Sequence, residues 1–195
     1  MIVGVLLAAG KAVRFGGDKL LSELGDGRCV AEVAAARLLP SVDRLIAIVR
    51  PGSGELSERL AAAGAEVFEF QNAHLGMGAS LAYGVGEAPE AQGWLIALAD
   101  MPLVATEDAM KVADAVRQGA GIAIPVANTR RGHPVGFSRQ YFSELVALSG
   151  DIGARSIISK YADDCLEIPV GDQDSWLDVD SRSDLVLARQ LFKPL

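Results

Sequence analysis

Glycines and cations gather directly after the first apolar run of the chain. They are Gly10, Lys11, Arg14, Gly16, Gly17 and Lys19. Glycines allow backbone N–H groups to approach phosphate oxygens closely, and cations neutralise the charge that remains. The spacing is not that of a Walker A loop, since five residues separate Gly10 from Gly16, and the dinucleotide pattern G-x-G-x-x-G does not occur here. A phosphate-binding loop and an ordinary glycine-rich turn both fit this composition.

Three aspartates have the right chemistry for a divalent cation. Asp100 follows an apolar run, and one carboxylate combined with substrate phosphates and water suits Mg²⁺. Asp178 and Asp180 alternate on an extended segment, so they should share a face and repel each other unless a cation lies between them. As alternatives, Asp100 is a turn residue, and Asp180 competes with Ser181 to cap the last helix. We expect Asp100 to bind the metal, with either Asp178 or Asp180 as the second ligand.

Residues 72–81 form the next segment with polar groups. Ser80 falls on the first turn of an expected helix, whose free amides could bind an anion or a polar ligand. An ordinary helix start explains the same pattern. Met77 is expected to fill space in the core.

Two later loops carry charges suited to a phosphorylated substrate. Arg130, Arg131 and His133 make a cationic loop, which could bind a phosphate or simply be solvated. Asp151 and Arg155 flank Gly153 in the second loop. That loop could equally join two helices, with Asp151 capping the second one and Arg155 as a surface charge. Neither loop resembles a catalytic triad or a metal cluster.

Strand-like and helix-like segments alternate along the chain and must position these residues. Strands are expected at residues 2–7, 45–49, 66–70, 94–99, 122–126, 134–137 and 165–170. Helices are expected at residues 29–39, 56–63, 79–85, 141–148 and 154–161, with two more that begin at Thr106 and Ser181 as N-caps. This alternation predicts one α/β domain over residues 1–195, with a mostly parallel sheet. In such sheets ligands bind beyond the carboxyl ends of the strands, where the glycine loop and Asp100 lie.

Composition narrows the class of protein. Half of the 195 residues are hydrophobic, and the net charge is −7, which argues against a dedicated nucleic-acid binder. The apolar residues 1–9 lack the basic start and cleavage site of a signal peptide, and no run is long enough to cross a membrane. Two cysteines, Cys29 and Cys165, are too few for a disulfide framework and are expected to be inert. We expect a cytoplasmic protein that binds neither nucleic acid nor membranes.

The order of these motifs resembles that of the nucleotidyltransferases, and within them the MobA-like branch that acts on the molybdenum cofactor. Leu-Ala-Ala-Gly at residues 7–10, then Arg14, Phe-Gly at 15–16 and Lys19, is similar to the family's opening signature. Further segments resemble the family's motifs in the family's order, and they lie at residues 72–81, 100–102, 132–137, 150–155 and 178–181. The resemblance covers nearly the whole domain.

The resemblance implies a fold and a role for each motif. The fold would be a three-layer α/β/α, Rossmann-like domain whose mixed, mostly parallel sheet has one reversed strand. Arg14 and Lys19 would bind the phosphates of the nucleotide and, with Asp100, be the catalytic residues. The nucleotide would contact Leu7, Ala8, Ala9, Gly10, Arg14, Lys19, Asn72, Gly78 and Ser80. Mg²⁺ would be bound by Asp100, Asp178 and Asp180, and the acceptor by His133, Asp151 and Arg155.

The implied activity is transfer of CMP from CTP to the phosphate of molybdopterin, with release of pyrophosphate. The partners would be the nucleoside triphosphate, the phosphorylated pterin and a molybdoenzyme that receives the product. A guanylyltransferase, a nucleotidyltransferase acting on a sugar or alditol phosphate, and a non-catalytic protein that delivers the cofactor remain as alternatives.

Overall fold

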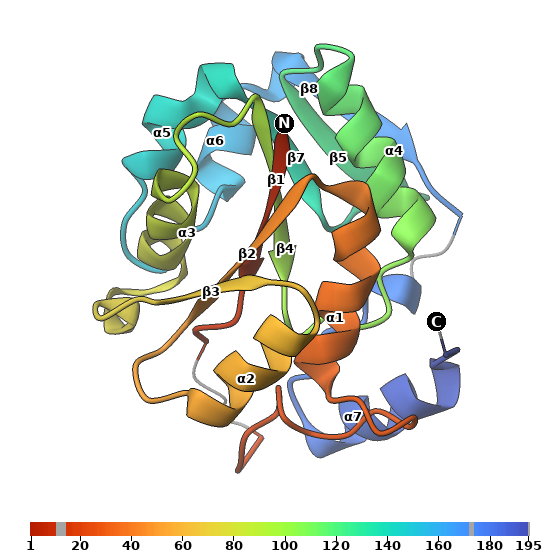
Figure 1. Cartoon of the computed structure of the whole chain (residues 1–195). Helices are drawn as coiled ribbons and strands as arrows, with labels where there is room; N and C mark the ends of the chain where they lie inside the picture. The colour runs from red at the N-terminus through yellow and green to blue at the C-terminus, as the bar shows by residue number, and fades with distance from the viewer. Residues whose placement is uncertain (11–14, 172–173, 195) are drawn as a thin grey trace.

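A central β-sheet organises the chain in the computed structural model, which describes residues 1–10, 15–171 and 174–194 (Figure 1). Within these residues the sheet has eight strands, in the order β3-β2-β1-β4-β7-β5-β6, and β8 also pairs with β5. The strands are β1 (Ile2–Leu7), β2 (Arg44–Val49), β3 (Glu66–Glu69), β4 (Gly93–Leu98), β5 (Ile122–Ala127), β6 (Arg130–Arg131), β7 (Val135–Ser138) and β8 (Cys165–Pro169).

The directions of the strands confirm the expected mixed sheet. β1 runs parallel to β2 and to β4, β2 runs parallel to β3, and β8 runs parallel to β5. β7 is antiparallel to both β4 and β5, so it is the reversed strand. The two-residue β6 is also antiparallel to β5. β1 is apolar along its whole length because both faces of the sheet are covered.

Helices cover both faces of the sheet (Figure 1). In the described residues they are α1 (Val30–Leu38), α2 (Gly54–Ala62), α3 (Met77–Gly86), α4 (Thr106–Arg117), α5 (Phe142–Val146), α6 (Arg155–Lys160) and α7 (Arg182–Leu191). One apolar cluster joins the sheet to α1, α2, α4 and α7, and a second joins the opposite face to α3, α5 and α6.

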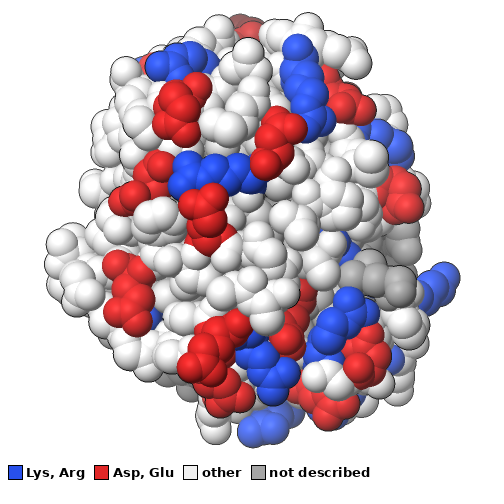
Figure 2. Space-filling view, viewed as in Figure 1, with Lys and Arg blue, Asp and Glu red and all other residues white. Residues whose placement is uncertain are grey.

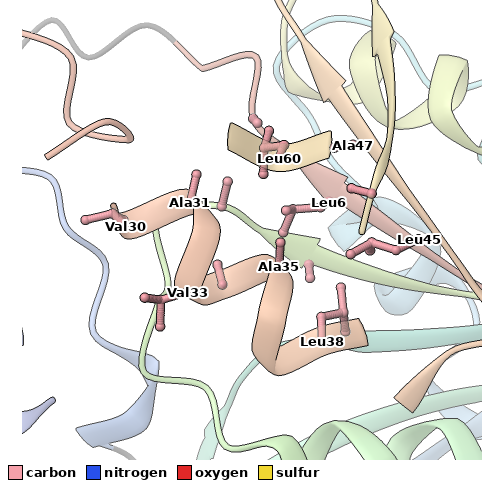
Figure 3. Packing of buried hydrophobic residues seen from close by; sticks show 14 of the residues in the cluster. Leu6, Val30, Ala31, Val33, Ala35, Leu38, Leu45, Ala47 and Leu60 are labelled. Carbon is pink, nitrogen blue, oxygen red and sulfur yellow. The ribbon is translucent and has the colours of Figure 1, made fainter. Parts of the chain in front are cut away.

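The alternation of side chains along β1 divides the two apolar layers. Ile2 and Leu6 point into the cluster with α1, whereas Val3 and Val5 point into the cluster with α3. In Figure 3 the small side chains of α1, such as Ala35, lie against the sheet residues on the first of these faces. The expected three-layer α/β/α fold is therefore confirmed.

Two helix starts show which capping predictions hold. Ser181 caps α7, since its Oγ accepts a hydrogen bond from the backbone N–H of Asp184 at 3.2 Å. In return, Asp184 Oδ2 accepts a hydrogen bond from the backbone N–H of Ser181 at 2.7 Å. The prediction that Thr106 caps α4 is wrong. Thr106 is the first helical residue, and its hydroxyl donates to the carbonyl of Arg37 at 3.0 Å instead. No described helix is both long enough and apolar enough to cross a membrane.

Candidate functional site

The carboxyl ends of β1 and β4 lie side by side at the point where the chain switches from one side of β1 to the other. β2 lies on one side of β1, and the later strand β4 lies on the other. Such a crevice is where ligands bind in open α/β sheets. A cavity of about 400 Å³ opens there, and its lining includes Ala9 and Gly10 after β1 and Asp100 after β4.

Lys19 forms the electrostatic centre of this cavity. Its Nζ donates to Asp100 Oδ2 and to Asp180 Oδ1, at 2.7 Å in each case, and the residue is only 8% exposed. Burial by itself lowers the pKa of Lys19, but the hydrogen bonds and charges of Asp100 and Asp180 outweigh it and raise the pKa above its ordinary value. Lys19 is therefore a fixed positive charge at neutral pH.

The backbone of residues 178–180 brings Asp180 to Lys19. Val179 N donates to the carbonyl oxygen of Asp100 at 2.9 Å, and the Val179 side chain is fully buried in the core. The flanking carboxylates of Asp178 and Asp180 then face away from that core. Partial desolvation of the Asp178 carboxyl, together with the negative charges of Asp100 and Asp180, raises its pKa to about 6.

Two aromatic contacts hold this C-terminal segment in place. The Arg182 guanidinium lies 4.7 Å from the centre of the Phe15 ring, which connects α7 to the residues just before Lys19. The Trp176 indole is buried with Met101 and Ala127. A Cβ atom at Gly132 would lie 2.0 Å from this indole, so only glycine fits at position 132.

The N-terminal end of α3 closes one side of the cavity. Ser80, 3% exposed, lines the cavity and its Oγ donates to the carbonyl of Gly76 at 3.1 Å. Gly78 N donates to the Gly150 carbonyl at 2.8 Å, and a Cβ atom at Gly78 would lie 2.5 Å from the carbonyl oxygen of Ile152. The absence of a side chain at Gly78 therefore lets residues 149–152 pack directly on α3.

A second cavity of about 800 Å³ adjoins the first, and Leu7, Met77, Leu98 and Asp151 line both. Its walls combine apolar residues with polar ones, and the lining includes Ile124, Val135, Ile152, His133 and Arg155.

The polar groups of the 130–133 segment are less cationic than the sequence suggested. His133 Nδ1 lies 3.4 Å from the Ile96 carbonyl, and burial lowers the pKa of the ring, so it is neutral at pH 7. Arg131 is paired with Glu167 at 2.9 Å. The expectation of a cationic loop therefore does not hold for His133.

The structure places most of the predicted nucleotide-binding residues around the first cavity. Leu7, Ala9, Gly10, Lys19 and Ser80 line it. Three further residues do not. Ala8 is buried and its N–H donates to the Ile48 carbonyl, Gly78 packs against residues 149–152, and Asn72 is exposed outside the cavity. Arg14 lies outside the described residues.

The prediction that Met77 fills the core is wrong, because Met77 is 44% exposed and lines both cavities. The helix begins at Met77, earlier than the expected residue 79, and this places the side chain at the mouth of the cavities. His74 and Gly76 also line the first cavity. They lie in the 72–81 segment that resembles a family motif, but they were not among the individual contacts expected from the sequence. The close Gly76-x-Gly78 spacing is the sequence signal that could have indicated a close backbone contact here.

The loop of residues 150–155 does more than join two helices. Asp151 lines both cavities and Arg155 lines the second, while Ala154 stands at the N-cap of α6, so the alternative in which Asp151 caps that helix is wrong.

Burial raises the pKa of Cys29 to about 11, consistent with an inert thiol.

Asp100 and Asp180 are the carboxylates whose positions suit a divalent cation. Within the described part of the chain, no group of three or more His, Cys, Asp or Glu side chains could hold a metal ion. Asp100 and Asp180 nevertheless direct one oxygen each at a single positive charge, the ammonium of Lys19. Oxygen donors of this kind suit Mg²⁺ or Mn²⁺ when substrate phosphates and water supply the remaining ligands.

Comparison with known proteins identifies relatives over nearly the whole chain. The model of the MobA-like NTP transferase domain family matches residues 4–165. Rv0371c of Mycobacterium tuberculosis H37Rv is 28% identical, with a TM-score of 0.86 over 97% of each chain, and a second structure of it is a complex with manganese. The nucleotidyl transferase Mth528 of Methanothermobacter is 21% identical, with a TM-score of 0.84 over 97% of this chain and 96% of that one.

A more distant structure shares the fold alone. CMP:2-keto-3-deoxy-manno-octonic acid synthetase, solved with CTP, is 15% identical with a TM-score of 0.77 over 97% of each chain. No curated protein gives a significant sequence match.

Proposed function

The chain belongs to the MobA-like NTP transferase domain family, and from this premise we propose that it transfers CMP from CTP to the phosphate of molybdopterin, releasing pyrophosphate. One observation supports this proposal above the others. Lys19 and Asp100 line a cavity of about 400 Å³ at the carboxyl ends of β1 and β4, a size that suits a nucleotide. The molybdoenzyme that uses the modified cofactor is the expected recipient of the product.

In the reaction, a phosphate oxygen of the acceptor attacks the α-phosphorus of the triphosphate. The new bond joins that oxygen to phosphorus, and the bond between the α-phosphorus and the bridging oxygen of the β-phosphate breaks as pyrophosphate leaves. An ionised phosphate needs no general base, so catalysis consists of positioning and charge neutralisation. Lys19 supplies a buried positive charge, and we propose that Arg14 assists it on the phosphates.

Asp100 and Asp180 are the residues that would hold a divalent cation, and Mg²⁺ is our proposal for it. Such an ion would neutralise phosphate charge during transfer. The related Rv0371c was solved with manganese, which supports a divalent cation in this family. We favour Asp180 over Asp178 because Asp180 and Asp100 already share one cationic partner.

The second cavity is our proposed acceptor site. It adjoins the nucleotide cavity along Met77 and Asp151, so two substrates could lie with their phosphates next to each other. Apolar residues such as Ile124 and Val135 suit a flat heterocycle. The neutral ring of His133 can donate a hydrogen bond to that heterocycle or accept one from it. Arg155 supplies a positive charge for the acceptor phosphate.

Pyrophosphate release tests the proposal. The purified protein would be given CTP, GTP or ATP with molybdopterin, a sugar phosphate or an alditol phosphate, in the presence of Mg²⁺. We expect release with CTP and molybdopterin only. Release with GTP, or with another acceptor, would reassign the base or the acceptor within the same reaction class. Tight binding of molybdopterin without release from any pair would instead identify a cofactor-delivery protein.

A Lys19→Ala variant provides the matched test of mechanism. We expect it to lose turnover while it keeps a cooperative thermal transition, because Lys19 acts on the phosphates. The control is Lys111→Ala, which removes a half-exposed lysine that pairs with the buried Asp108 on α4, outside the cavity. Near-wild-type turnover of the Lys19 variant would contradict the mechanism.

A further inference from the structure

We propose that Lys19 is an internal counter-ion that occupies the divalent-cation site of the free protein and leaves it when the triphosphate binds. This inference rests on the proposed function, since it concerns the same site. It adds an order of events: the free protein binds the cation weakly, and the nucleotide and the cation then bind cooperatively.

The geometry of the carboxylates supports the occupation of the cation site by Lys19 in the free protein. Asp100 Oδ2 and Asp180 Oδ1 are each 2.7 Å from Lys19 Nζ. The side chain of Lys19 is 10% exposed, so the ammonium fills the space between the two carboxylates and is little hydrated. Mg²⁺ needs such oxygens at about 2.0 to 2.1 Å. Because two cations cannot share that space, the ammonium must move before the metal ion binds both residues.

The position of Lys19 in the cavity supports its movement away from the carboxylates when the triphosphate binds. Lys19 lines the nucleotide cavity together with Gly10 and Ser80, so the same ammonium faces the space where we place the phosphates. A lysine has a flexible four-carbon stem and three donors that can exchange one anionic partner for another. The phosphates of a bound nucleotide offer that second partner, and the carboxylates of Asp100 and Asp180 are then free.

The arrangement couples the two ligands through one side chain. A nucleotide that draws Lys19 away increases the affinity for the cation. By thermodynamic linkage, the cation increases the affinity for the nucleotide by the same factor. Couplings of this kind amount to about 5- to 150-fold in affinity. Removal of the lysine charge should therefore strengthen cation binding and weaken the coupling.

Direct measurement of Mn²⁺ binding tests this inference without any turnover. The affinity for Mn²⁺ would be measured by electron paramagnetic resonance in the absence of nucleotide, for the wild type, Lys19→Met and Lys19→Arg. We expect Lys19→Met to bind Mn²⁺ about tenfold more tightly than the wild type, within the range of such couplings. Lys19→Arg keeps a positively charged side chain at this position, so it should bind Mn²⁺ as weakly as the wild type does.

Two controls separate this effect from a general change in charge or folding. Lys111→Met removes a lysine from the ion pair with Asp108 on α4 and should leave Mn²⁺ affinity unchanged. The analogue provides a second test. A non-hydrolysable CTP analogue should tighten Mn²⁺ binding to the wild type about tenfold more than it tightens Mn²⁺ binding to Lys19→Met, because phosphate ligation of the metal is common to both proteins and displacement of Lys19 occurs only in the wild type.

The outcomes separate failure of the inference from failure of the proposed function. Equal Mn²⁺ affinity of the wild type with and without the analogue, or no gain in Lys19→Met, would overturn the counter-ion role while leaving the metal site in place. If neither the wild type nor Lys19→Met binds Mn²⁺ under any condition, both the metal site and the counter-ion role are wrong. Tighter Mn²⁺ binding by Lys19→Met, together with no pyrophosphate release by the wild type from any substrate pair, would support the counter-ion role and reject the proposed function.

Discussion

Gly78→Ala is the substitution that most directly tests how α3 positions residues 149–152. The new Cβ would lie 2.5 Å from the Ile152 carbonyl oxygen, 2.9 Å from that of Ser149 and 3.0 Å from that of Gly150. All three atoms belong to the backbone, so the loop must move as a unit. Since Cβ contacts below 3.0 Å do not occur, the shift from 2.5 to 3.0 Å is the least movement required, about 0.5 Å.

This movement has a cost in stability and in rate. Loss of the bond from Gly78 N to the Gly150 carbonyl costs about 1 kcal/mol, and the overpacking costs about 1 to 3 kcal/mol, partly offset by the helix propensity of alanine. We expect a net loss of about 2 kcal/mol and a Tm lower by about 5 °C. Misplacement of Asp151 by half an ångström should lower kcat/KM about tenfold, since about 1 Å costs roughly 100-fold.

Gly86→Ala is the matched control. Gly86 ends the same helix, is exposed, and a Cβ atom there would meet nothing within 4 Å. Its Tm should equal that of the wild type or lie slightly above it, because alanine favours the helix, and its kcat/KM should be unchanged. Thermal unfolding would be followed by circular dichroism and turnover by pyrophosphate release. A Gly78→Ala protein with wild-type Tm would refute the packing argument. A lowered Tm with unchanged kcat/KM would refute the positioning role of the loop.

Three further predictions concern other parts of the molecule. Gly132→Ala should lower the free energy of unfolding by about 3 kcal/mol in urea, because its Cβ would overlap the buried Trp176 indole; an unchanged midpoint would contradict this. The pKa of Asp178 is raised to about 6 from 3.8, so the folded state binds more protons than the unfolded state between these values, and stability falls as pH rises through them. Asp178→Asn should therefore be about 1 kcal/mol more stable than the wild type at pH 7, after allowance for screening by solvent, and equal to it below pH 4; a difference independent of pH would refute the cause. Cys29, with a pKa of about 11, should resist iodoacetamide at pH 7.5 until the protein unfolds, and mass spectrometry of the native protein would detect any early modification.

The layers of the fold could be predicted because they depend on local patterns. Residues 2–7 are apolar along their whole length, which is typical of a strand covered on both faces, and β1 has these bounds. The Ser181–Asp184 spacing predicted the cap of α7 for the same local reason. The reversed strand β7 was expected from the family resemblance and not from periodicity.

The site could be predicted in part, because its residues lie at strand ends. Gly10 and Asp100 follow β1 and β4, and the topology of a parallel sheet brings such positions together. The ion pairs of Lys19 could not be predicted, since they join residues 81 and 161 positions apart. The neutrality of His133 likewise depends on burial, which is a property of the packed protein.

The surface shows why net charge predicts little about this site. On the face in Figure 2, acidic and basic side chains are interleaved over the surface. The −7 average therefore describes a mixture of local pairs, such as Arg44 with Glu66 at 2.6 Å. We expect binding of a small polyanion to depend on the few cations that line a cavity, above all Lys19.

The hydrogen bond from Val179 to Asp100 has a consequence for biosynthesis. A nascent chain can pair all strands of the sheet once residues up to 169 are available, because β8 ends at Pro169. Asp180 reaches Lys19 only after Val179 docks against the loop that follows β4, and contacts so distant in sequence form late. A partly synthesised polypeptide would thus contain the residues of the first cavity but lack the carboxylate of Asp180. Under the proposed function, we expect nucleotidyl transfer to begin only after α7 has folded onto the domain.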